Sequence, residues 1–216
     1  MRLPDKDSPW ATGLFLALVG LLGGGLMVLA SWHATPYIDD NERRYLLSML
    51  TAVAPEGFDH LPADSAEFLD APEWFPVGGG VTVYRAYREG APAAAIFDVH
   101  APDGYTGPIR LLVGVNARGT VSGVRVVSHR ETPGLGDGIE VERSPWMFGF
   151  DGRSRANMPD GQWRLRRDGG GFDQLTGATV TSRAVLHTVH RVLEFHDTHR
   201  ERIYPTGTRE EGRGDE

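Results

Sequence analysis

The chain has 216 residues and a formal net charge of −7, which argues against nucleic acid as its main partner. Hydrophobic residues make up 40 % and charged residues 24 %, proportions that allow one packed domain beside a membrane segment. The sequence has no cysteine, which excludes disulfides, cysteine-ligated iron–sulfur clusters, thioether-linked haem, cysteinyl flavin and cysteine-based zinc sites. A redox function would therefore need a cofactor that is held in another way.

A membrane-spanning helix is predicted over residues 11–32, after a short tail of residues 1–10. No charged residue lies between Ser8 and Trp32, and Ala11–Ser31, at about 1.5 Å per residue, spans roughly 30 Å, the thickness of the hydrocarbon layer. Trp10 and Trp32 stand at its two ends, where interfacial anchors are expected. The alternative is a cleaved signal peptide, but the sequence near Ser31 is a poor match to a cleavage site. Two basic residues lie near each end of the helix, so charge alone hardly determines its orientation.

Residues 33–80 are predicted to connect this helix to the domain. Asp40 can cap a helix that runs to about Val53. Apolar residues follow it at helical spacing, namely Leu46, Met49, Leu50 and Val53. The segment Gly57–Gly80 contains several Pro and Gly residues, so we expect it to be irregular.

The main domain is predicted over residues 81–200 and begins with strands. Four segments have the composition and polarity of strands: Val81–Arg88, Ala94–His100, Ile109–Val115 and Thr120–Ser128. The last two should form a hairpin, because Gly119 stands where its turn needs a positive φ. The fold class is therefore predicted as α+β, an N-terminal transmembrane helix followed by one domain with an antiparallel sheet and flanking helices.

The second half of the domain has fewer patterns that predict helices or strands. The segment from His129 to about Phe172 is rich in Gly and Arg, and its apolar residues do not recur at helical or strand spacing. A helix is predicted over Ser182–His196, with a buried stripe at Val185, Val189, Val192 and Leu193. Residues 201–216 are polar, and we expect a disordered tail there.

The turn before this last helix is a candidate phosphate site. In the segment Asp173–Ser182, Thr181 or Ser182 can cap the helix, whose unpaired N–H groups attract a phosphate. Gly177 and Ala178 leave the backbone open to a bulky group, and a threonine here offers a hydroxyl that can be esterified. Turns and caps of this composition are also common without any ligand.

Five residues of this turn carry a resemblance to a known family. Asp173, Thr176, Gly177, Ala178 and Thr179 match the D-x-x-[S/T]-G-A-T flavinylation motif. The chain thus resembles the FMN-binding domains of the G subunit of the Rnf/Rsx electron-transport complex and of the C subunit of the sodium-translocating NADH:quinone reductase. The resemblance implies that a flavin transferase uses FAD to attach FMN, through a phosphoester, to Thr179. Thr181 would stand beside the flavin.

A loop upstream strengthens the resemblance. His129-Arg130-Glu131-Thr132-Pro133-Gly134-Leu135-Gly136-Asp137 is similar to the H-x-E-T-P-G-L-G segment of the Rnf G subunit, and Asp103–Gly107, Trp146 and Phe150 fit as well. A turn with so few bulky side chains lets the backbone approach a flat ring. We expect four of its residues to border the flavin: Glu131, Thr132, Gly134 and Leu135.

His129 and Glu131 could instead be metal ligands or an acid–base pair. We prefer the interpretation that they are satisfied polar residues of the loop, because no nucleophile motif accompanies them. No metal site and no catalytic residue are expected.

The resemblance implies an electron-carrier subunit rather than a self-contained enzyme. It would relay electrons through covalent FMN within a membrane complex that couples electron transfer to ion translocation. Its partners would be the other subunits of the Rnf/Rsx complex and, during maturation, the flavin transferase. The expected location is the cell inner membrane, with a cytoplasmic tail, one membrane span and the domain in the periplasm.

Two alternatives remain open. One is a cofactor-free, membrane-anchored extracytoplasmic binding or scaffold domain. The other is a free-standing flavin reductase, for which 216 residues leave no room for a further catalytic domain.

Overall fold

The structure is a computed structural model that describes residues 9–55, 57–59 and 66–205. It divides into two compact units, residues 1–46 and residues 47–216. Three expectations lie outside the described residues: most of the N-terminal tail, the tail beyond residue 205, and the side chain of Trp32 as an anchor.

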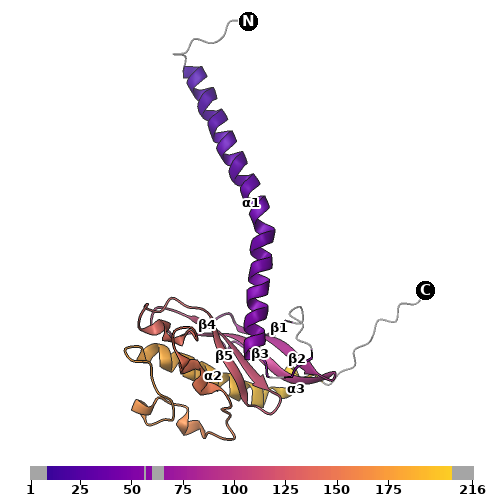
Figure 1. The fold of residues 1–216 in the computed structure, drawn as a ribbon, viewed down its shortest axis with the longest axis vertical. Helices are drawn as coiled ribbons and strands as arrows, with labels where there is room; N and C mark the ends of the chain where they lie inside the picture. Colours follow the sequence, from indigo (N-terminus) through magenta and orange to yellow (C-terminus); the bar gives the residue numbers. More distant parts are fainter. Residues whose placement is uncertain (1–8, 56, 60–65, 206–216) are drawn as a thin grey trace, which may run out of the picture. The chain divides into compact units, whose positions relative to one another are not determined.

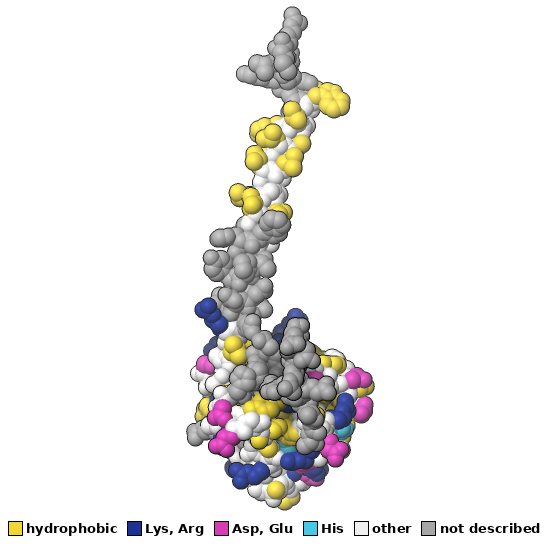
Figure 2. Space-filling view, turned by 90° about the vertical axis from the view of Figure 1, so that its right-hand side faces the viewer, with side chains coloured by type: hydrophobic (Ala, Val, Ile, Leu, Met, Phe, Trp, Pro, Cys, Tyr) yellow, Lys and Arg dark blue, Asp and Glu magenta, His cyan; other side chains and the backbone are white. Residues whose placement is uncertain are grey.

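The first unit consists of most of helix α1, Pro9–Val53. Within it, Thr12–Leu29 has a mean hydropathy of 2.2 and is a candidate membrane span by length and composition. Hydrophobic side chains are exposed along this stretch on the face seen in Figure 2, and none of it is buried within the protein. We expected two helices, with a new one capped by Asp40. That expectation was wrong, because the backbone of α1 is helical without a break through Asp40.

The second unit is built on a five-stranded sheet (Figure 1). Its strands pair in sequence order and are antiparallel throughout. They are β1 (Glu67–Asp70), β2 (Gly80–Arg88), β3 (Ala91–Ala101), β4 (Ile109–Asn116) and β5 (Val121–Ser128). The four predicted strands and the hairpin are confirmed, and Gly119 in its turn has φ 82°. The α+β fold is therefore confirmed.

Strand β1 lies in the segment that we expected to be irregular. Only Leu69 of its four residues is buried, so the sequence shows no alternation of apolar and polar positions. The strand forms because its backbone pairs with β2, with Leu69 opposite Val81.

Helix α2, Thr179–Thr198, covers one face of the sheet, and the short helix α3, Arg200–Ile203, follows it (Figure 1). We expected a disordered tail from residue 201. That expectation was wrong for residues 201–203, which belong to α3 and bury Ile203 in the core. The predicted stripe of Val185, Val189, Val192 and Leu193 is fully buried. Its partners include Phe97, Leu111 and Val113 of the sheet, so the main core lies between helix and sheet.

The last residues of α1 in this unit rest on the β4–β5 pair. Gly114 and Gly123 are register partners, and a Cβ on Gly114 would lie 2.0 Å from the carbonyl oxygen of Val53. The Ser122 hydroxyl donates to the same carbonyl at 2.5 Å. Two paired glycines thus make room for the helix end.

The Gly- and Arg-rich segment is irregular but well packed. It forms four short 3-10 helices: η2 (Gly136–Ile139), η3 (Pro145–Phe150), η4 (Asp160–Gln162) and η5 (Arg166–Asp168). Phe150 and Phe172 stack with ring centroids 5.0 Å apart, and Trp163 is 2 % exposed. Aromatic anchors therefore hold a segment that has no helical or strand period.

The buried His196 predicts a pH-dependent stability. Its Nδ1 lies 3.3 Å from Asp197 Oδ1 and its Nε2 lies 3.3 Å from Tyr204 Oη. Burial lowers the pKa of its imidazole, although Asp197 opposes the shift. Because the unfolded chain takes up this proton near pH 6.5 and the folded chain resists it, the free energy of unfolding should decrease as pH falls below about 6.5.

Thermal unfolding checks this expectation. The unfolding temperature should drop between about pH 7.5 and about pH 5.5, and it should drop less in His196→Gln. Burial also lowers the pKa of His187, so part of the pH dependence should remain. An equal drop in both proteins would contradict the assignment to His196.

Candidate functional site

The candidate site begins where the chain turns into α2. Gly177 has φ 77°, Ala178 is the N-cap residue without a side-chain cap, and Thr179 is the first helical residue. The expectation that Thr181 or Ser182 caps the helix was wrong. The Ser182 hydroxyl instead donates to the carbonyl oxygen of Ala178 at 2.9 Å and accepts from the N–H of Leu175 at 3.0 Å.

A cavity of about 530 Å³ opens beside this turn. It joins three segments that are far apart in the sequence: the loop around Tyr105, the 129–137 loop and the start of α2. Its lining consists of Tyr105, Glu131, Thr132, Leu135, Gly136, Arg167 and residues 177–181. Most of the predicted site residues thus meet in one place.

Three predicted residues do not line the cavity. Gly134 lies in the same loop with φ 78°, which accounts for a glycine there. Asp173 is exposed and pairs with Arg166 at 3.2 Å. Thr176 is also exposed.

The three threonines of the turn differ in their surroundings. Thr181 is 1 % exposed, and its hydroxyl donates to Glu131. Thr176 lies outside the cavity lining, whereas Thr179 lines the cavity and is only half-buried. Of the three hydroxyls, that of Thr179 therefore combines access with a position in the cavity.

Glu131 joins the three segments of the site. Its side chain is buried, with the residue 4 % exposed. One carboxylate oxygen accepts the Thr181 hydroxyl. The other accepts the N–H of Thr106 at 3.1 Å and lies 3.3 Å from its hydroxyl. The carboxylate is thus occupied by protein donors and fixes the cavity wall.

Two glycines make room for the close packing between the 129–137 loop and the start of α2. A Cβ on Gly136 would lie 2.7 Å from Cβ of Glu131, and one on Gly177 would lie 2.8 Å from a methyl carbon of Leu135. A side chain at position 136 would displace Glu131 within the loop, and one at position 177 would displace the end of the Leu135 side chain.

The rim of the cavity is apolar and exposed. Tyr105 is 67 %, Leu135 48 % and Val180 44 % exposed. A planar aromatic ligand would cover such surface favourably.

Two groups beside Thr179 can attract an anion. The first turn of α2 offers unpaired N–H groups. Arg167 Nη1 also donates to Thr179 Oγ1 at 3.1 Å. The sequence did not single out Arg167, because it lies among several arginines of an aperiodic segment. A cavity with these anion-attracting groups and an apolar rim fits a phosphorylated planar cofactor.

Both ring nitrogens of His129 have polar partners. Its Nε2 lies 2.8 Å from Glu140 Oε1, and its Nδ1 accepts the N–H of Glu131 at 3.0 Å. With both ring nitrogens engaged, it is a poor metal ligand.

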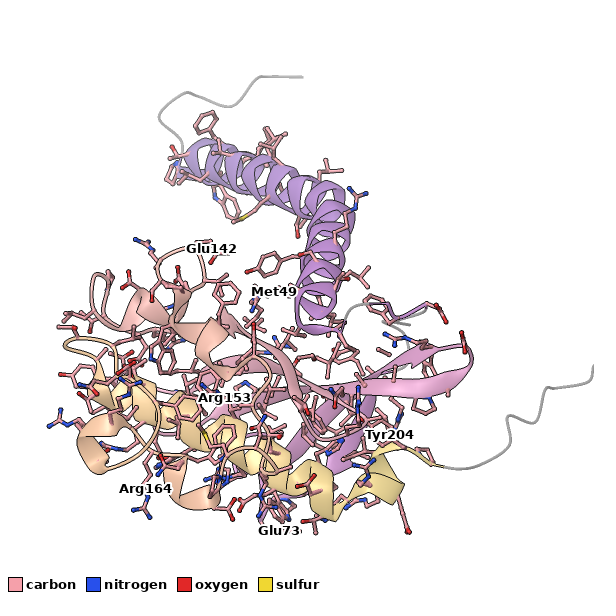
Figure 3. The ribbon with its side chains drawn as sticks, turned by 60° about the horizontal axis from the view of Figure 1, so that its bottom comes forward. Met49, Glu73, Glu142, Arg153, Arg164 and Tyr204 are labelled. Atoms are coloured by element: carbon pink, nitrogen blue, oxygen red, sulfur yellow. The ribbon has the colours of Figure 1, made fainter. Side chains whose placement is uncertain are left out.

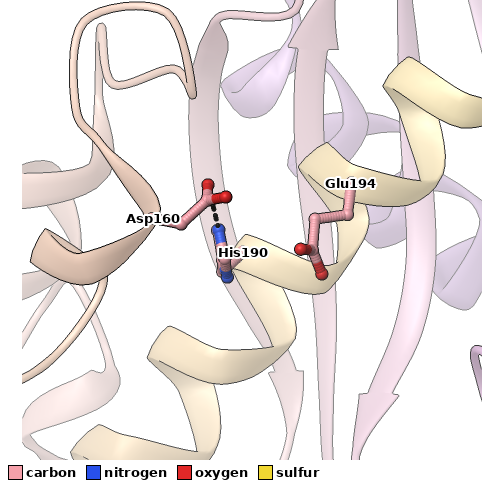
Figure 4. Close-up of side chains that lie close together, drawn as sticks. All are labelled: Asp160, His190 and Glu194. Atoms are coloured by element: carbon pink, nitrogen blue, oxygen red, sulfur yellow. Dashed lines mark hydrogen bonds and ion pairs between the residues drawn. The ribbon is translucent and has the colours of Figure 1, made fainter.

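A second polar cluster lies where η4 meets α2 (Figure 4). Asp160, His190 and Glu194 each offer a ligand atom, all within 4.8 Å of one another. However, Arg155 donates to both oxygens of Asp160, at 3.1 and 3.0 Å. Arg155 and His190 lower the pKa of Asp160 to about 2. We interpret the cluster as an ion-pair network that ties the irregular segment to α2.

Comparisons with known proteins agree on one family. A model described as FMN-binding domain matches residues 104–194. The G subunit of the ion-translocating oxidoreductase complex from Pseudomonas aeruginosa is 43 % identical and covers 94 % of this chain and 95 % of its own length. Proteins of the same name from Vibrio cholerae and Cereibacter sphaeroides are 38 % and 45 % identical. They cover 89 % and 90 % of this chain, and 92 % and 87 % of their own lengths.

Proposed function

This chain belongs to the family of the G subunit of the ion-translocating oxidoreductase complex and carries an FMN-binding domain, and we propose that it relays electrons through one FMN joined covalently to Thr179. The observation that supports this residue best is that the three threonines differ in both access and position. Thr179 lines the cavity, Thr181 is buried on Glu131, and Thr176 lies outside the lining. The hydroxyl of Thr179 is the one that is both accessible to a transferase and placed in the cavity.

The attachment would be a phosphoester. A phosphodiester keeps one negative charge, which suits the N–H groups of the first turn of α2. The free hydroxyl of a threonine is too weak an acid to attack unaided, so the base and any metal would come from the flavin transferase. Covalent attachment would prevent loss of the cofactor outside the cytoplasm.

The flavin ring would lie against the 129–137 loop and the apolar rim. Tyr105, Leu135 and Val180 would contact the ring, while Glu131 and Thr132 would shape the wall beside it. Bound FMN supplies one- and two-electron transfer. The chain itself would need no substrate pocket, because its donor and acceptor would be cofactors of neighbouring subunits.

Flavin fluorescence in a denaturing gel tests this proposal. The full-length chain, co-expressed with a flavin transferase, should keep its flavin after denaturation, and the chain expressed without the transferase should not. A chain that stays colourless with the transferase would favour a cofactor-free scaffold domain and would refute covalent attachment.

We further propose that α1 anchors the chain in the inner membrane, with residues 1–10 in the cytoplasm and the domain in the periplasm. Because the chain has no cysteine, single introduced cysteines report its orientation. Glu73 is exposed in the domain (Figure 3). In intact cells, a membrane-impermeant maleimide should label Glu73→Cys, whereas Asp5→Cys should react only after lysis. The reverse pattern would overturn the proposed orientation.

A further inference from the structure

Arg167 stands beside the proposed attachment residue but outside the flavinylation motif. Its Nη1 donates to Thr179 Oγ1 at 3.1 Å, and its side chain lines the cavity. The two residues are 12 positions apart in the sequence, so the fold brings them together.

The backbone that carries Arg167 is held in place. Arg166 N–H donates to the carbonyl oxygen of Phe172 at 2.7 Å, and Gly169, with φ 84°, caps the C-terminus of the 3-10 helix η5. The next residue, Asp168, pairs with Arg183 of α2 at 2.7 Å. A closed turn, tied to the helix that bears Thr179, thus presents the guanidinium to the hydroxyl.

We infer that Arg167 is a catalytic residue for the maturation of this chain, which activates Thr179 Oγ1 as a nucleophile and afterwards balances the charge of the phosphoester. The inference rests on the proposed function. In the attachment step, a bond forms between Thr179 Oγ1 and the flavin-side phosphorus of FAD. The bond from that phosphorus to the bridging oxygen breaks, AMP leaves, and the hydroxyl proton passes to a base of the transferase.

The direction of the hydrogen bond favours this role. Arg167 donates, so it engages a lone pair of Oγ1 and leaves the hydroxyl hydrogen free for removal. The positive guanidinium stabilises the negative charge that develops on Oγ1 and on the neighbouring phosphoryl oxygens. A guanidinium has five N–H donors in a fixed fork, so one can stay on Oγ1 while another reaches a phosphate oxygen.

The test is the rate of flavin incorporation into the full-length chain by purified transferase and FAD. Arg167→Ala should lower the apparent kcat by about tenfold or more, with little change in the KM for the chain. Arg167→Lys should recover part of the rate, because it keeps the charge but not the fork.

Arg164→Ala is the matched control. Arg164 is an exposed arginine of the same segment that does not line the cavity (Figure 3), and its loss removes the same charge. Its rate should equal that of the wild type.

Three results would overturn the inference: an unchanged rate in Arg167→Ala, an equal loss in Arg164→Ala, or a raised KM with unchanged kcat, which would make Arg167 a docking contact for the transferase. If the wild-type chain itself takes up no flavin, the proposed function fails first. Thermal unfolding of each variant excludes misfolding as the cause.

Discussion

Replacing Thr179 by alanine is expected to abolish covalent flavin and to leave the fold intact. Of the three threonine hydroxyls in the turn, the variant loses the one that lines the cavity without being buried against Glu131. Thr179 is half-buried and is the first residue of α2, a helical position rather than the loop position that we expected. Alanine is a good helix former, so the free energy of unfolding should change by no more than about 0.5–1 kcal/mol.

The measurement combines gel fluorescence with thermal unfolding. Thr179→Ser keeps a hydroxyl at the same position and should retain part of the fluorescence. Full fluorescence in Thr179→Ala would show that another residue carries the flavin, and a large loss of stability would leave misfolding as the explanation.

The second large effect is expected at Glu131. In Glu131→Ala, the Thr181 hydroxyl and the Thr106 N–H both lose their acceptor inside a buried wall. Unsatisfied buried donors and a lost charged acceptor should lower the free energy of unfolding by about 2–4 kcal/mol. Flavin incorporation should decrease as well, because the 129–137 loop is no longer tied to the start of α2.

Urea unfolding of the flavin-free chain measures this effect. Glu142→Ala is the matched control, since it removes an exposed carboxylate (Figure 3) and should change stability by less than about 0.5 kcal/mol. In a double-mutant cycle, Glu131→Ala and Thr181→Val should couple by about 1.5–3 kcal/mol, as hydrogen bonds to charged groups do. Additive effects would contradict a direct hydrogen bond between these two side chains.

The sheet and α2 could be predicted because their patterns are local. Strands β2 to β5 have the composition of strands, and the stripe from Val185 to Leu193 repeats at helical spacing. By contrast, β1 buries only Leu69 and owes its existence to its pairing with β2. The segment from His129 to Phe172 is ordered by long-range aromatic contacts, such as the stacking of Phe150 on Phe172, which no short window shows.

Part of the candidate site could likewise be predicted from the sequence, and part of it could not. The motif around Thr179 is contiguous, so it could be identified directly from the sequence. The N-cap prediction failed because the hydroxyl of Thr181 is used by Glu131, a residue 50 positions away. Arg167 was missed for a similar reason, since nothing in the sequence indicates which arginine of its segment faces Thr179.

Peptide mass spectrometry of the chain purified from its native membrane tests the central claim most directly. Cleavage after Arg167 and Arg183 releases residues 168–183, which contain Thr176, Thr179 and Thr181. Fragmentation of this peptide distinguishes the three. We predict one FMN, linked through its phosphate with loss of water, on Thr179. An adduct on Thr176 or Thr181, or an unmodified peptide from a chain that still functions in its complex, would contradict this account.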